Sequence, residues 1–172
     1  VEMALQALSA DSPQDCTLLE AQCIIPELQE SAEQYEDLEQ LIRDGNDLGY
    51  VLDEQGQGQP HFLEKYFAAM ELEQCDTIAM ALDIAQNLNC YDMVLAGKEK
   101  AYGQKKMEKL MNQPADPVLT PACAHLDEYG LYLLEQEGYV LNAEGTAYIR
   151  RNSQEFHFEH TAPRAEPGVT MN

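Results

Sequence analysis

Apolar residues recur at helical spacing through much of the first half of this chain. In the stretch from Glu33 to Glu54, four leucines are separated by steps of three, seven and four residues, which places one apolar stripe along a helix. We expect an interruption of this helix near Gly45-Asn46. Two further helical patterns follow. The first carries Phe62, Leu63, Tyr66, Phe67 and Met70, and the second carries Ile78, Ala81, Leu82, Ala85 and Leu88.

Short links join these three patterns, so residues 33–89 are typical of a small helical bundle. The link before the second pattern contains two glycines within residues 54–59. Asp76 or Thr77 is the predicted N-cap of the third helix, because their side chains accept hydrogen bonds from the first turn. The bundle is therefore the predicted middle part of the chain.

Outside the bundle the pattern changes between alternating and helical spacing. At the start, residues 2–8 look like the last turns of a helix, and Thr17–Ile25 alternates as a strand does. After the bundle we expect a short strand over residues 91–95 and an amphipathic helix in the lysine-rich segment 98–109. Then come a helix from about 121 to 136, ended by Gly138, and a hairpin of strands 139–142 and 147–150 joined by residues 143–146.

These elements predict an α+β fold in several parts. A helix–strand remnant of an N-terminal α+β domain occupies residues 1–30, and the acidic helical middle domain occupies residues 31–90. A C-terminal α+β domain ending in a β-hairpin occupies residues 91–152, and a polar tail follows over residues 153–172. The tail is expected to be mobile unless it docks on a partner.

The charge of the chain is strongly negative and unevenly distributed. The 172 residues hold 31 acidic and 10 basic side chains, a formal net charge of −21. Residues 1–97 carry twenty acids against two cations, whereas residues 98–109 carry five lysines. A chain of this sign repels nucleic acid and anionic membranes, so we expect no direct contact with either. It attracts basic surfaces, including those that normally hold DNA.

The cysteine pattern and the hydropathy indicate a cytoplasmic protein. Five widely spaced cysteines form no CxxC pair, and their odd number argues against a disulfide framework. We expect reduced and mostly buried thiols. No apolar run approaches the roughly 18 residues of a membrane span, and the first residues lack the basic region of a signal peptide. The chain starts within a helical pattern, which suggests a fragment of a longer protein.

The motifs of common enzymes are absent from the sequence. It contains no GxSxG, no HExxH, no glycine-rich phosphate loop and no zinc-type cysteine spacing. His157 and His160 flank Glu159 in a run that could hold a metal, but a solvated terminal segment is the favoured interpretation. Asp53-Glu54 and Asp127-Glu128 are adjacent pairs whose side chains point apart, so neither makes a convincing acid–base dyad. We expect no catalytic residues, no cofactor and no metal.

The candidate functional feature is the set of carboxylates on and beyond the 33–54 stretch. Carboxylates three or four residues apart on a helix lie about 5–6 Å from each other, and the usual neighbouring lysines are missing here. We predict a surface that binds a basic partner and that acts as a whole more than through any single residue. Its members are Glu33, Glu36, Asp37, Glu39, Asp44, Asp47, Asp53, Glu54, Glu64, Glu71, Glu73, Asp76 and Asp83.

Several short motifs resemble the ArdA-type antirestriction proteins of conjugative plasmids and transposons. The clearest is LDEYGLYLLEQEGYVLNAEGTAYIRRN at residues 126–152, where Tyr129, Gly130, Gly138, Gly145 and Tyr148 fit the family outline. The runs DLGYVLDE (47–54), FLEKYFAAME (62–71) and DTIAMALDIAQNLNCYDMV (76–94) are similar to the family's acidic central helices and the link that follows them. The sequence departs from the pattern at residues 1–25, which hold only a remnant of the first domain, and in its unusually basic segment 98–109.

The resemblance implies an elongated protein of three small domains, often a homodimer, that imitates the shape and charge of B-DNA. Such proteins occupy the DNA-binding groove of type I restriction–modification enzymes and block restriction. Another hypothesis stays open beside it. The chain is then an acidic protein–protein interaction module of a mobile-element protein, without DNA mimicry, because excess acid alone is more often a solvated face.

Overall fold

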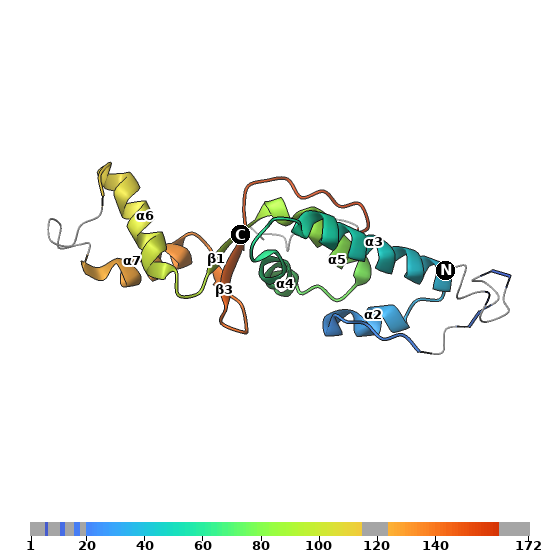
Figure 1. Cartoon of the computed structure of the whole chain (residues 1–172). Helices are drawn as coiled ribbons and strands as arrows, with labels where there is room; N and C mark the ends of the chain where they lie inside the picture. Colours follow the sequence, from blue (N-terminus) through green and yellow to red (C-terminus); the bar gives the residue numbers. More distant parts are fainter. Residues whose placement is uncertain (1–5, 7–10, 13–15, 18–19, 115–123, 162–172) are drawn as a thin grey trace, which may run out of the picture. The chain divides into compact units, whose positions relative to one another are not determined.

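The computed structural model describes residues 6, 11–12, 16–17, 20–114 and 124–161. Within these ranges the chain forms six α-helices and one three-stranded antiparallel sheet, so the predicted α+β class is confirmed (Figure 1). The predicted helix at residues 2–8 lies outside the described residues except for Gln6.

The chain divides into two compact units that interleave along the sequence. The first unit combines Val1–Pro60, Gln74–Asn87 and Phe156–Asn172, and the second combines His61–Glu73 with Leu88–Glu155. Each unit is described below by itself.

The first unit is helical, and its core is a helix that is apolar on nearly all sides. It contains a 3-10 turn η2 (Pro26–Leu28) and the helices α2 (Gln29–Glu33), α3 (Leu38–Gly56) and α5 (Ile78–Gln86). α3 packs along α5 (Figure 1). The Ile78 amide at the start of α5 donates to the Ser31 hydroxyl of α2 at 3.2 Å. The buried apolar residues are Leu28, Ala32, Leu48, Cys75, Ile78, Ala81, Leu82, Ile84 and Ala85.

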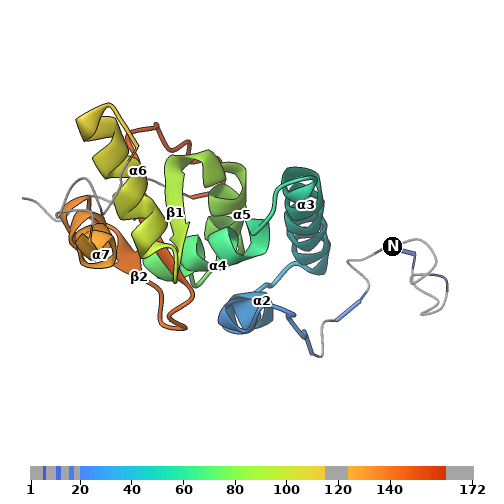
Figure 2. The ribbon, with the colours of Figure 1, turned by 60° about the vertical axis from the view of Figure 1, so that its left-hand side comes forward.

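The second unit is a small sheet with helices on both faces. Its elements are α4 (Phe62–Leu72), η3 (Leu88–Cys90), β1 (Tyr91–Leu95), α6 (Glu99–Met111), α7 (Leu126–Gln136), β2 (Val140–Leu141) and β3 (Ala147–Arg151). The strand order is β1-β3-β2. α4 lies on one side of the sheet and the α6–α7 pair on the other (Figure 2).

The register explains how the two faces of this sheet differ. Asp92 stands opposite Arg150 and Met93 opposite Ile149, and neighbouring residues of a strand point to opposite faces. Ala147 and Ile149 are buried, on the face that also carries Arg151. Arg151 forms an ion pair with Glu73 just beyond α4 at 2.6 Å, which identifies this face as the one covered by α4.

α6 and α7 approach each other so closely that only glycine fits at the crossing. A Cβ atom at Gly103 would lie 2.3 Å from the Leu126 carbonyl oxygen, and one at Gly130 would lie 1.9 Å from the Glu99 carbonyl oxygen. Both glycines are buried. The two glycines therefore set the distance between these helices.

Several element predictions are confirmed. The strand at Tyr91–Leu95 has the predicted bounds, and the hairpin forms with Gly145 in its turn at a φ of 69°. The lysine-rich segment forms helix α6, and Gly138 ends α7 at a φ of 79°. Of the two candidates for the cap of α5, Thr77 fills the position, because its hydroxyl accepts from the Met80 amide at 3.3 Å.

Three other predictions are wrong. The described residues of 17–25 form no strand, because the Gln29 side chain bonds both the Cys23 amide and the Ala21 carbonyl in place of a neighbouring strand. The acidic helix does not break near Gly45. It begins at Leu38, and Glu33 belongs to the separate helix α2.

The third error concerns which helices pack together. The sequence predicted one bundle over residues 33–89, but α4 packs on β3 and belongs to the second unit. The short links that join α4 to α3 and α5 do not determine which elements α4 packs against. α4 is buried on Phe62, Tyr66, Ala68, Ala69 and Met70, so it needs more apolar cover than two helices provide, and the sheet supplies it.

Among the described cysteines, Cys16, Cys23, Cys75 and Cys90 are free thiols, and the last two are buried as predicted. Cys123 lies outside the described residues. No helix within the described ranges has the length and apolar character needed to span a bilayer.

Candidate acidic binding surface

The acidic helix α3 begins at a capping aspartate that the sequence had assigned to a partner surface. The Asp37 carboxylate accepts from the Glu39 amide at 2.8 Å and from the Gln40 amide at 3.4 Å. A carboxylate in this position satisfies free N–H groups and opposes the positive end of the helix dipole. Asp37 therefore has a structural role as well as a charge.

One face of α3 carries most of its exposed charge. Glu39, Arg43, Asp47, Tyr50 and Glu54 follow steps of four, four, three and four residues, so they form a row on the same side of the helix. All five are exposed. The leucine stripe faces the other way, and Leu48 is its one fully buried member. With 19 residues, α3 is about 28 Å long.

Part of the acidic set on α3 is already engaged within the unit. Glu39 forms an ion pair with Arg43 at 3.2 Å, with both side chains well exposed. Asp44 accepts from the Tyr35 hydroxyl at 2.7 Å and from the Gln40 amide group at 2.6 Å. Burial and the Asp44 carboxylate raise the pKa of Tyr35, so this hydroxyl remains a donor. Asp44 is accordingly only half exposed.

Four other acidic residues have no such partner. Glu36, Asp47, Asp53 and Glu54 are exposed, and their side chains form no hydrogen bond or ion pair within the described ranges. The carboxylates are therefore available to a partner without breaking an internal contact. Glu33 accepts from Gln29 at 2.6 Å, and Asp76 is exposed before α5.

Three predicted members of the set lie in the second unit and have local partners there. Glu64 bonds His61 at 3.1 Å, and Glu71 accepts from the Ala143 amide of the hairpin at 2.7 Å. Glu73 is the acid of the Arg151 ion pair and also accepts from the Tyr91 hydroxyl at 3.0 Å. The Glu71 and Glu73 contacts hold α4 against the sheet and its hairpin.

Asp83 does not belong to any surface, which corrects the prediction. It is fully buried on α5, and its carboxylate bonds residues 159–161. The sequence contains a signal for this. Asp83 sits among Ala81, Leu82, Ile84 and Ala85, and a helix that is apolar on all sides is a buried helix.

Tyr50 is the surface residue that reasoning from the sequence missed. It is 68% exposed and lies between Asp47 and Glu54 in the row along α3. Tyrosine is enriched at protein interfaces because its ring packs while its hydroxyl bonds. Its position outside the leucine stripe was the available signal.

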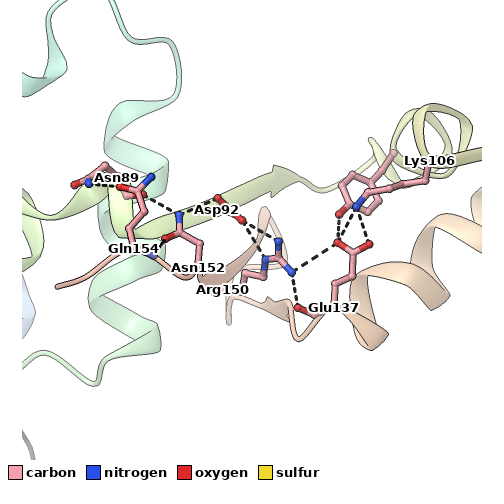
Figure 3. A network of polar contacts seen from close by, with 8 residues as sticks. Asn89, Asp92, Lys106, Glu137, Arg150, Asn152 and Gln154 are labelled. Atoms are coloured by element: carbon pink, nitrogen blue, oxygen red, sulfur yellow. Dashed lines mark hydrogen bonds and ion pairs between the residues drawn. The ribbon is translucent and has the colours of Figure 1, made fainter. Parts of the chain in front are cut away.

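The densest polar cluster in the second unit is structural. Arg150 donates to Asp92 at 2.9 Å and to the Glu137 carbonyl oxygen at 2.8 Å. Glu137 also accepts from Lys106 at 2.8 Å and from the Tyr102 hydroxyl (Figure 3). Every charged member is paired with another, so the cluster joins α6 and the end of α7 to the sheet.

Comparison of the chain with protein-family models, with characterised proteins and with solved structures finds no match. The resemblance to ArdA-type proteins therefore stays a prediction that rests on the quoted motifs.

Proposed function

We propose that the acidic helical unit binds a basic surface of a DNA-binding protein in place of DNA. The observation that carries this proposal is the segregation of charge between the two units. Among the described residues, the first unit holds fifteen carboxylates and one cation, Arg43, whereas the second holds twelve carboxylates and eight cations. A unit with so few cations attracts basic grooves over several ångströms. The DNA-binding groove of a type I restriction–modification enzyme is the proposed target, on the strength of the motif resemblance.

The charge density of α3 sets a condition on this mechanism. With Asp37 included, α3 carries six carboxylates and Arg43, a net charge of −5 along about 28 Å. Duplex DNA carries one charge per ~1.7 Å, so α3 alone reaches about a third of that density. Binding in place of DNA therefore requires the other acids of the unit, such as Glu27, Glu30 and Glu36, beside those of α3.

The same shortfall favours the second candidate function. An acidic interaction module needs only a partner with a few well-placed cations, and α3 with Tyr50 offers such a face without a DNA-like charge density. In that case the protein binds a basic partner but does not compete with DNA.

Displacement of DNA separates the two functions. The purified protein is titrated into a complex of a type I methyltransferase with fluorescent DNA, at about 50 and 200 mM salt. We expect release of the DNA at low salt and weaker release at moderate salt, because screening reduces charge attraction. Failure to displace DNA at either salt concentration would sink the proposal of DNA mimicry.

A matched pair of variants tests whether the first unit carries the activity. One variant neutralises the unpartnered acids Asp47, Asp53 and Glu54 as Asn, Asn and Gln. Its control neutralises the exposed acids Asp127, Glu135 and Glu144 of the second unit and has the same net charge. Exposed charges contribute about 0.2–1 kcal/mol each, so the first variant should lose roughly 3- to 150-fold in affinity. Equal losses in both variants would show that net charge alone drives binding.

A further inference from the structure

Two polar residues lie buried one turn apart at α5, the most apolar helix of the first unit: Asp83 within the helix and Asn87 as its C-cap. Asp83 is 0% exposed and Asn87 is 4% exposed, and they are the two buried polar residues of the described chain. Both side chains bond a segment more than 65 residues later, residues 156–161. We call this segment the strap.

The Asp83 carboxylate is satisfied by donors from the strap. It accepts from the backbone amides of Glu159, His160 and Thr161 at 2.9, 3.0 and 2.9 Å, and from the Thr161 hydroxyl. No cation pairs with Asp83 within the described residues. Burial opposes its charge, but these four donors hold the pKa of Asp83 below its usual value. Three successive amides around one anion form the kind of concavity that binds carboxylates and phosphates.

Asn87 bonds the strap in the way a neighbouring strand does. Its Nδ2 donates to the His157 carbonyl oxygen at 2.8 Å, and its Oδ1 accepts from the His157 amide at 2.9 Å. The same Nδ2 also donates to the Asp83 carbonyl oxygen at 2.7 Å, which fixes the orientation of the side chain. α5 therefore recognises the strap at two points, mainly through its backbone.

The strap contributes little apolar burial in return. His157, Glu159 and His160 are exposed. Phe158 is 38% exposed, and its ring centre lies 4.7 Å from the ring centre of Phe156 in a tilted arrangement. Segments held by polar contacts with few buried apolar groups open locally at lower free energy than a core does. These contacts correct the prediction that the chain beyond Asn152 is a tail, because residues 156–161 are docked.

We propose that Asp83 and Asn87 form a peptide-docking site on α5, and that residues 156–161 of the same chain occupy it as an exchangeable strap. The ligand class is an irregular peptide backbone with three successive free amides and a Thr or Ser hydroxyl at the last of them. The strap blocks this site in cis, where a tethered segment has an effective concentration on the order of millimolar.

Hydrogen exchange of the full chain tests the docking. In the wild type, the amides of residues 159–161 should exchange at least about tenfold more slowly than in an unfolded peptide. Asp83→Asn should remove this protection, because an amide nitrogen then faces the amide donors. The control Glu159→Gln also removes one negative charge, but from an exposed side chain, and should leave the protection unchanged. Unprotected amides in the wild type, or unchanged protection in Asp83→Asn, would overturn the proposal.

A second variant separates release of the strap from unfolding of α5. Thr161→Pro removes one amide donor and the hydroxyl without altering α5, so α5 should stay protected while the strap opens. A fluorescent peptide with the sequence of residues 154–161 should bind this variant and not the wild type, whose site is occupied. The same peptide with proline at its last position should not bind. Equal binding to both proteins, or no binding to a variant whose strap has opened, would refute the site.

Discussion

Replacing Gly130 with alanine tests whether the α6–α7 crossing is as close as the structure describes. The added Cβ would lie 1.9 Å from the Glu99 carbonyl oxygen and 2.6 Å from its carbonyl carbon, far inside the 3.4–4 Å of ordinary contact. Both neighbours are backbone atoms of the first turn of α6, so no side chain can move aside. Relief requires the helices to separate by more than 1 Å along the crossing.

The expected loss combines two opposing effects. Forcing an extra methyl group into a packed crossing costs about 3 kcal/mol, and more where the backbone must shift. Alanine is favoured over glycine in a helix by about 1 kcal/mol. We therefore expect Gly130→Ala to lower the free energy of unfolding by about 2 kcal/mol. For a unit of this size that corresponds to a fall in Tm of roughly 8–16 °C.

Two glycines on α3 provide a control, because alanine there is expected to raise stability instead of lowering it. Gly45 and Gly49 lie inside a helix, and a Cβ at either position meets nothing within 4 Å. Gly45→Ala and Gly49→Ala should therefore stabilise the protein by up to about 1 kcal/mol.

Thermal unfolding followed by circular dichroism measures the stability of the α3 variants and of the α6–α7 variants. Hydrogen exchange shows which helices lose or gain protection. Gly103→Ala should resemble Gly130→Ala, because its Cβ would lie 2.3 Å from the Leu126 carbonyl oxygen. A Gly130→Ala protein within about 0.5 kcal/mol of wild type would refute the close crossing.

Three further results are expected. Asp37→Ala should lower the free energy of unfolding, measured in urea, by about 1 kcal/mol because α3 loses its cap. Glu36→Ala loses no contact and should change this free energy little. Equal effects would contradict the capping role. Burial opposes the charge of Asp92 and of Glu137. The pKa of each carboxyl nevertheless lies below its usual value, because Asn152 and Arg150 donate hydrogen bonds to Asp92, and Lys106 and Tyr102 donate to Glu137. Their stabilisation is present above the unfolded pKa of about 4 and is lost as pH falls through the lower folded pKa. The urea midpoint should therefore drop as the pH falls below about 4, and less so in Glu137→Gln. In the DNA-displacement assay, Asp47→Asn alone should change affinity less than about fivefold, and a larger loss would indicate one specific contact instead of a distributed surface.

Local patterns in the sequence were sufficient for elements whose chemistry is local. Alternation between turn residues predicts β1 and the hairpin, and the hydroxyl of Thr77 predicts the start of α5. The strand predicted at residues 17–25 failed because alternation does not supply a neighbouring strand. The side chain of Gln29 occupies the backbone groups that such a neighbour would need.

Features that depend on long-range packing could not be derived in this way. The grouping of α4 with the sheet depends on its packing against β3, which lies more than 70 positions later in the sequence and carries Arg151, the partner of Glu73. The docked strap depends on Asp83, which the sequence analysis had assigned to the acidic binding surface. On α3, helical spacing decides which carboxylates share a face, and their role in binding a partner stays a prediction.

The interleaving of the two units has a consequence for how the protein is made. The chain passes between the units after residues 60, 73, 87 and 155. The second unit has all its residues once position 155 has left the ribosome, although it begins later in the sequence. The first unit gains the donors to its Asp83 carboxylate only when residues 159–161 have been made. Domains usually complete in N- to C-terminal order during synthesis, whereas here the last contact of the first unit forms only after the whole second unit has been made.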